Sequence, residues 1–198
     1  MEMFNYVMVL ASVIIGLGIT HLLTGVADIA QHPGRAKIYW VHLVWVGATF
    51  LRAIFWWWFE FEFSTVTQWT FSLYFFVLAY ALLIYLWCAL LIPRDLVGYD
   101  GYKDYFYSRR AWFFGVGLAT VFADFADTLL KGMDHFASLG MVYVALQVMW
   151  TILFVIALRT RNERFHAMFA LIAVAALLIY PVTNFDTVQR APIAAVNR

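Results

Sequence analysis

The chain has 198 residues, of which 65% are hydrophobic, 20% aromatic and only 13% charged, and its formal net charge is +1. Soluble domains are roughly 45–50% apolar and about 25% charged, so this sequence lacks the polar residues that cover a water-exposed surface. The composition predicts an integral membrane protein, and the near-zero net charge gives no electrostatic reason to expect nucleic-acid binding.

About six apolar stretches are long enough to cross a bilayer, because a spanning helix needs about 20 mostly apolar residues. In chain order they are Phe4–Ala30, Ile38–Phe59, Gln68–Ile92, Ala111–Leu130, Leu139–Leu158 and Phe165–Tyr180. Lipid offers the backbone no hydrogen-bond partners, so we expect an all-α bundle of transmembrane helices. We assign residues 1–183 to this single domain and residues 184–198 to a short polar tail. The first stretch follows no positive charge, so we expect it to be a retained span and not a signal peptide.

Basic residues are concentrated in alternate connections between the predicted spans. Nine of the 13 lie in or beside the first, third and fifth connections: Arg35, Lys37, Arg94, Lys103, Arg109, Arg110, Arg159, Arg161 and Arg164. Positive loops favour the cytoplasmic side of a membrane. We therefore expect a multi-pass protein of the cell membrane with these connections in the cytoplasm and both termini outside. Within the third connection, Tyr99–Tyr107 suits either a short helix lying on the membrane or an ordered polar loop.

Two spans carry small or polar residues at every fourth position. The first row is Ser12, Gly16, Thr20, Thr24 and Asp28, and half a chain length later comes Ala111, Gly115, Ala119, Ala123 and Asp127. With three spans in each half, this offset is compatible with the 3+3 inverted repeat of many secondary transporters. Small residues also let any two helices pack closely. We expect helix contacts at Ser12, Gly16, Gly18, Thr20, Gly25, Gly115, Gly117 and Ala119.

Ionisable side chains are costly inside a membrane, about 2.5–3.5 kcal/mol at its centre on insertion scales, so each is a functional candidate. The candidates for transport or gating are His21, Asp28, His42, Arg52, Asp124 and Asp127. Arg52 in the second span has Asp124 and Asp127 of the fourth span as natural partners. The interpretation is either a structural ion pair or a gate in which Arg52 competes with a cation or proton for the aspartates.

The two histidines leave three interpretations open. His21 and His42 lie on different spans and suit the ligation of a b-type haem, a proton relay with Asp28, or hydrogen bonding between helices. Apart from this pair, we find no metal-ligand, catalytic or nucleotide-binding motif, and we expect no enzymatic activity.

The sequence therefore favours a channel or transporter for a proton or small cation. The alternatives are an accessory or scaffolding membrane subunit without transport activity, and a haem redox protein using His21 and His42. Membrane lipids should surround the chain, and we expect a homo-oligomer or a membrane-protein partner.

Overall fold

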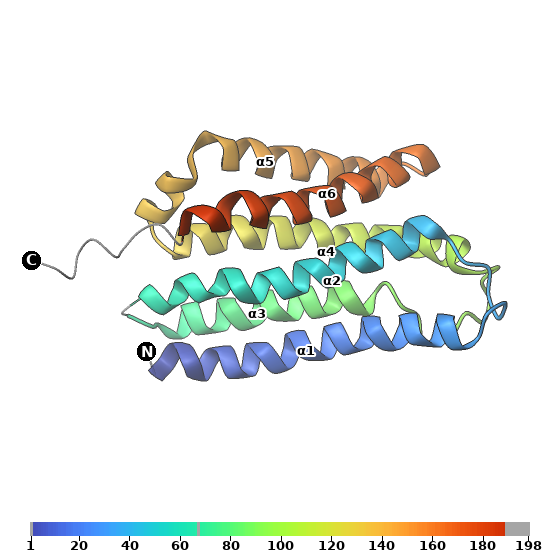
Figure 1. Cartoon of the computed structure of the whole chain (residues 1–198), viewed down its shortest axis with the longest axis horizontal. Helices are drawn as coiled ribbons and strands as arrows, with labels where there is room; N and C mark the ends of the chain where they lie inside the picture. Colours follow the sequence, from blue (N-terminus) through green and yellow to red (C-terminus); the bar gives the residue numbers. More distant parts are fainter. Residues whose placement is uncertain (1, 67, 189–198) are drawn as a thin grey trace, which may run out of the picture.

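The structure is a computed structural model that describes residues 2–66 and 68–188, and within these ranges it contains only helices, turns and loops. The α-helices run up and down as one bundle (Figure 1). Their bounds are α1 Glu2–Gln31, α2 Trp40–Phe59, α3 Phe71–Ala89, α4 Tyr102–Leu130, α5 Met133–Arg159 and α6 Glu163–Val188, and a short 3₁₀ helix, η1, spans Glu60–Thr65. The predicted all-helical bundle is confirmed.

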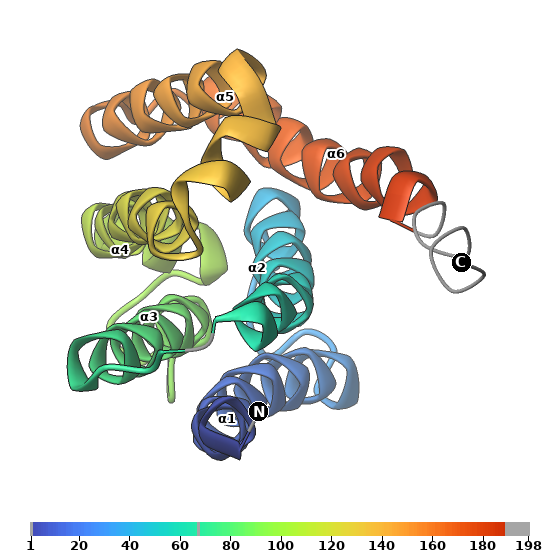
Figure 2. The ribbon, with the colours of Figure 1, turned by 90° about the vertical axis from the view of Figure 1, so that its left-hand side faces the viewer.

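Five of the helices, α1, α3, α4, α5 and α6, are long and apolar enough to cross a membrane. The exception, α2, contains five tryptophans together with His42 and Arg52, which lower its hydropathy. It nevertheless lies in the middle of the bundle, in contact with α1, α3, α4 and α6 (Figure 2). Its Trp45 and Trp56 are each 1% exposed. These features fit a multi-pass membrane protein in which four of the other helices shield α2.

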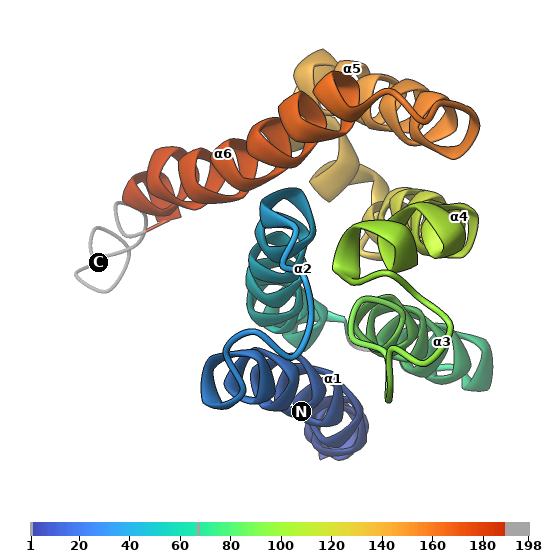
Figure 3. The same cartoon turned by 90° about the vertical axis from the view of Figure 1, so that its right-hand side faces the viewer.

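The two ends of the bundle differ in charge. The α1–α2, α3–α4 and α5–α6 connections meet at one end (Figure 3), which we call the basic end because it carries the nine Lys and Arg residues of those connections. The start of α1, η1 and the α4–α5 turn lie at the opposite end, which we call the Glu60 end (Figure 1).

Three helix boundaries differ from those predicted. The Tyr99–Tyr107 stretch is neither a separate surface helix nor a loop, because most of it forms the first turns of α4. The chain enters α4 through Gly101, which has a φ of 125°. A Cβ at Gly101 would lie only 2.9 Å from the Lys37 carbonyl oxygen, and the next residue, Tyr102, donates its N–H to that same oxygen at 3.1 Å. A backbone contact with the first connection therefore fixes where α4 begins.

The other two differences concern the last helices. α5 starts at Met133 and is broken at Gly140, which has a φ of 66°. α6 continues to Val188, so residues 184–188 of the predicted tail are helical, and residues 189–198 lie outside the described ranges.

Helix pairing is not the same in the two halves of the chain. α1 packs along α3, whereas the main neighbour of α4 is α5. A 3+3 inverted repeat would instead pair α4 with α6, in the way that α1 pairs with α3. The predicted correspondence between the halves therefore does not extend to these contacts.

Close approach between helices occurs at three of the predicted glycines. A Cβ would lie 3.4 Å from the Tyr85 Cα at Gly18, 2.4 Å from an Ile92 side-chain carbon at Gly25, and 2.4 Å from Phe154 Cε1 at Gly117. These positions bring α1 against the end of α3, and α4 against α5.

The other predicted packing positions differ among themselves: Ser12 contacts α2, and a Cβ at Gly115 would lie 3.9 Å from a Leu158 side-chain carbon of α5. Gly16 would have no atom within 4 Å of a Cβ, Thr20 is exposed, and Ser12 accepts a hydrogen bond from Trp57 Nε1 at 2.8 Å. Gly115 and Ala119 line a shallow apolar groove on α4. The reason is geometric, because an exact four-residue row drifts about 40° around a helix at each step. The buried line of α1 alternates steps of four and three instead: Ala11, Ile15, Gly18, Leu22 and Gly25.

Candidate functional site

The expected ion pair between α2 and α4 is present at the centre of the bundle. Arg52 Nη2 lies 2.6 Å from Asp124 Oδ1, and the two side chains are 18% and 29% exposed. Arg52 also donates to the Tyr80 hydroxyl, which in turn donates to Asp124 Oδ1 at 3.3 Å. One carboxylate oxygen therefore links α2, α3 and α4.

The second oxygen of Asp124 is held by α5. Gln147 Nε2 donates to Oδ2 at 2.6 Å and the Tyr143 hydroxyl lies 3.2 Å from the same atom. Thr128 of α4 is also within 2.8 Å of the Tyr143 hydroxyl. Since both oxygens accept hydrogen bonds and one faces a guanidinium, Asp124 is held as a carboxylate.

A second charged group lies towards the Glu60 end. Lys131 Nζ is 2.5 Å from Asp127 Oδ2 and 3.9 Å from Glu60 Oε2. The Lys131 side chain is only 5% exposed, and its ammonium group lies 5.0 Å from the centre of the Phe63 ring. Asp127, predicted as a partner of Arg52, instead forms a buried i,i+4 pair with Lys131, which also lies near Glu60 of η1.

The charges of these two networks do not balance. Three buried or partly buried carboxyl groups, those of Glu60, Asp124 and Asp127, face the two cations Arg52 and Lys131. Glu60 is 1% and Asp127 4% exposed, and Glu60 Oε2 and Asp127 Oδ1 accept no hydrogen bond within the described part of the chain. An unpaired buried charge is costly enough that the group is usually neutralised. Among the described residues, the cluster therefore holds one carboxyl group more than it holds cations.

Glu60 was not among the candidates predicted from the sequence. It follows the Trp56–Phe59 run directly and precedes Phe61, Glu62 and Phe63, so it resembles an acidic loop residue at an interface. In the structure Glu60 is instead the first residue of η1, and its side chain is buried. Burial raises the pKa of Glu60 well above its ordinary value, and the Asp127 carboxylate raises it further, whereas the Lys131 ammonium lowers it.

The two candidate histidines come together at the other end of α3. Leu90, Leu91 and Ile92 directly follow α3, which ends at Ala89, so their carbonyls lie outside its helical hydrogen bonds. Here three consecutive carbonyls each accept from a different helix: Leu90 from Tyr105 at 2.8 Å, Leu91 from His42 Nε2 at 2.7 Å, and Ile92 from His21 Nε2 at 3.0 Å.

These contacts give both histidines a cross-helix bonding role. His42 is 1% exposed and its ring stacks on Tyr102 with centroids 5.0 Å apart. Because a carbonyl only accepts, each Nε2 carries the proton and donates it. Ligation of a haem iron through these atoms would require both hydrogen bonds to break.

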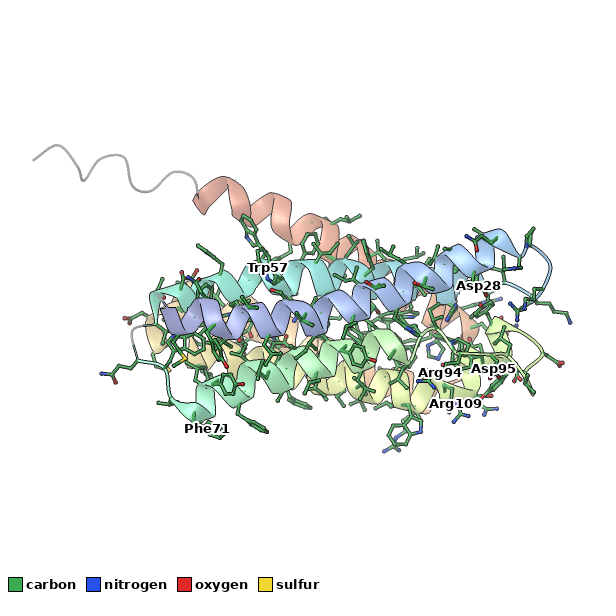
Figure 4. The ribbon with its side chains drawn as sticks, turned by 90° about the horizontal axis from the view of Figure 1, so that it is seen from below. Asp28, Trp57, Phe71, Arg94, Asp95 and Arg109 are labelled. Atoms are coloured by element: carbon green, nitrogen blue, oxygen red, sulfur yellow. The ribbon has the colours of Figure 1, made fainter. Side chains whose placement is uncertain are left out.

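Asp28 lies apart from the histidines. Its carboxylate is 3.1 Å from His32 Nδ1 and 3.6 Å from Arg35 Nη1, and its side chain is 51% exposed. It lines a surface pocket of about 300 Å³ at the basic end together with Arg94 and Asp95 (Figure 4). The structure brings together Arg52, Asp124 and Asp127 at one site and His21 and His42 at another, with Asp28 at neither.

Comparisons of the chain with protein-family models, with curated proteins and with solved structures found no match, so the chemistry of the site has to be argued from its own residues.

Proposed function

We propose that this chain carries a proton or a small cation across the membrane, and that the Arg52–Asp124 pair and the Glu60–Asp127–Lys131 group together form its binding site. The observation that supports this is the surplus of one carboxyl group over the cations. A buried site with one uncompensated negative charge favours uptake of one positive charge.

The arrangement of helices suits a site that changes state. Asp124 accepts hydrogen bonds from side chains of α2, α3 and α5, so a displacement of any of these helices alters its pairing. Arg52 then competes with the incoming cation or proton for the aspartates. Ionisable groups that face the interior of a membrane bundle characteristically mark ion pathways. The proposal does not depend on an inverted repeat.

The proposed orientation follows from the charge difference between the ends. The basic end would face the cytoplasm, because positive residues concentrate on that side. The Glu60 end, with the start of α1, would then face outwards, and the site would receive its ion from the outer side. The proposed location is the cell membrane.

A second candidate is an accessory subunit that packs against another membrane protein or another copy of the chain. The observation that favours it is the large uncovered apolar surface of α5, where Met141 is 79% and Val142 72% exposed. Lipid chains would cover this surface equally well. The exposed surface of α5 therefore supports the accessory role less strongly than the surplus carboxyl group supports transport.

Reconstitution into liposomes tests the proposal. With imposed gradients of protons, sodium or potassium, the wild-type protein should carry at least one of these ions faster than empty liposomes leak it. Asp124→Asn should abolish this flux, and Tyr143→Phe, which removes a single hydroxyl, should lower it several-fold. Glu62→Gln is the matched control, because Glu62 is a half-exposed carboxyl next to the site and should leave the flux unchanged.

Two outcomes contradict the proposal. One is a folded wild-type protein with no flux under any of the three gradients, which favours the accessory role. The other is unchanged flux in both Asp124→Asn and Tyr143→Phe.

A further inference from the structure

The Glu60–Asp127–Lys131 group contains two buried carboxyls and one ammonium group. Lys131 Nζ contacts Asp127 directly at 2.5 Å, but it lies 3.9 Å from Glu60 Oε2, beyond hydrogen-bonding distance. A charge-assisted hydrogen bond stabilises the ionised form of its acceptor. Asp127 therefore holds the negative charge that compensates Lys131, and among the described residues Glu60 is the carboxyl of this group without a hydrogen-bonded cation.

Among the described residues, the charged groups that act on Glu60 belong to α4 and α2, and one neighbouring hydroxyl belongs to α3. Lys131, Asp127 and Asp124 face it from α4, Arg52 from α2, and the Tyr80 hydroxyl belongs to α3. The side chain is 1% exposed and its Oε2 accepts no hydrogen bond from the described residues. With Arg52 paired to Asp124 and Lys131 to Asp127, the ionised form of Glu60 would leave the cluster with one net negative charge.

We propose that Glu60 is the group that binds the transported proton, with Lys131 as the neighbour that sets when it is released. The inference rests on the proposed function and narrows its substrate to the proton. A metal cation is disfavoured here, because the Lys131 ammonium would repel a second fixed cation next to Glu60 and already fills the space over the Phe63 ring.

The proton balance is simple. A proton from the outer aqueous side bonds to a carboxylate oxygen of Glu60, which becomes a neutral carboxylic acid, while Lys131 stays charged and paired with Asp127. Release breaks that O–H bond and passes the proton to water on the cytoplasmic side, and Lys131 is then shared between two carboxylates. A shift of Lys131 from Asp127 towards Glu60 would favour release, because an approaching positive charge stabilises the ionised carboxylate.

Infrared spectroscopy of the full chain in liposomes tests this assignment. A protonated carboxyl gives a C=O stretching band that ionised carboxylates lack. At neutral pH the wild-type protein should show this band. Labelling the glutamates with ¹³C should shift it, whereas labelling the aspartates should leave it in place. Glu62 and Glu163, unlike Glu60, are half-exposed and lie beside His135 and Lys103.

Variants complete the assignment. Glu60→Gln should remove the band and the proton flux, and should fold well because glutamine has the shape of the protonated acid. Glu62→Gln should retain both. The inference is overturned if the wild-type band is absent, if it shifts only with ¹³C-aspartate, or if it persists in Glu60→Gln.

The infrared and flux results separate the two proposals. Proton flux without a protonated glutamate band overturns the role of Glu60 and leaves the proposed function standing. A band with no proton flux overturns the claim that the proton is transported, and Glu60 is then a structural carboxylic acid.

Discussion

The two ends of the bundle both bury polar side chains, but they satisfy them differently. At the basic end, the carbonyls of Leu90, Leu91 and Ile92 each accept from one side chain, although His42 Nδ1 and His166 Nδ1 have no partner among the described residues. At the Glu60 end, the carboxyls outnumber the cations and two carboxyl oxygens accept nothing from the described residues. Burying a polar group is cheap when its bonds are made and costly when they are not. The unpaired atoms at the Glu60 end belong to carboxyl groups. We therefore expect ion binding to change the charge at this end.

The largest effect should come from breaking the ion pair at the charged site. Arg52→Ala leaves the partly buried Asp124 without its main cation, and removing one partner of a fully buried pair costs about 3–5 kcal/mol. The free energy of unfolding in mixed micelles should fall by up to this amount. The double variant Arg52→Ala/Asp124→Asn should recover part of the loss, because it removes the uncompensated charge as well. Wild-type stability in Arg52→Ala would show that the pair contributes little.

The next effect lies between the two ends, where α4 meets α5. Gly117→Ala places a Cβ 2.4 Å from Phe154 Cε1 and 3.0 Å from Trp87 Cζ2, and overpacking of this kind costs about 1–3 kcal/mol. Gly16→Ala is the control, because its Cβ would meet nothing within 4 Å. Gly117→Ala should lower the midpoint of thermal unfolding, whereas Gly16→Ala should leave this midpoint unchanged or raise it. Equal effects in the two variants would mean that α4 and α5 do not approach as closely as described.

A smaller effect on stability is expected at the basic end. His42→Phe keeps a ring against Tyr102 but removes the donor to the Leu91 carbonyl, and interhelical hydrogen bonds in membranes contribute about 1–2 kcal/mol at most. Stability should fall by this amount, while proton flux and the carboxyl band should stay as in the wild type. His32→Phe, at an exposed position, is the control. Loss of flux in His42→Phe with normal stability would contradict the proposal that the ion binds at the Glu60 end, because His42 lies at the basic end.

The smallest effect should come from Asp28. Its contacts with His32 and Arg35 are exposed, and such pairs contribute roughly 0.2–1 kcal/mol. Asp28→Asn should therefore change the unfolding midpoint little and should leave the flux intact. A flux defect in this variant would extend the functional site to the surface pocket at the basic end.

The spans and one ion pair were accessible from the sequence because they depend on simple quantities. The apolar lengths predicted the helices, and the sign and depth of Arg52 and Asp124 predicted their pairing. The roles of His21 and His42 were not decided, because their acceptors are backbone carbonyls, which any residue supplies and no sequence pattern marks.

Glu60 could not be recognised because its environment depends on how the chain turns after α2. In the sequence it is one of two glutamates in a Glu-Phe-Glu-Phe segment, and only η1 decides that Glu60 is buried while Glu62 is half-exposed. The row of small residues misled for a related reason, since spacing alone does not say which face of a helix meets a neighbour. Gly18 and Gly25 meet α3, but Gly16 and Thr20 do not.

The low hydropathy of α2 has a consequence for how the protein is made. Its polar side chains find their partners in segments that are synthesised later: Arg52 needs Tyr80 and Asp124, and His42 needs the Leu91 carbonyl. Lipid alone does not favour the entry of such a helix. We therefore expect α2 to enter the bilayer together with α3 and α4 and not before them.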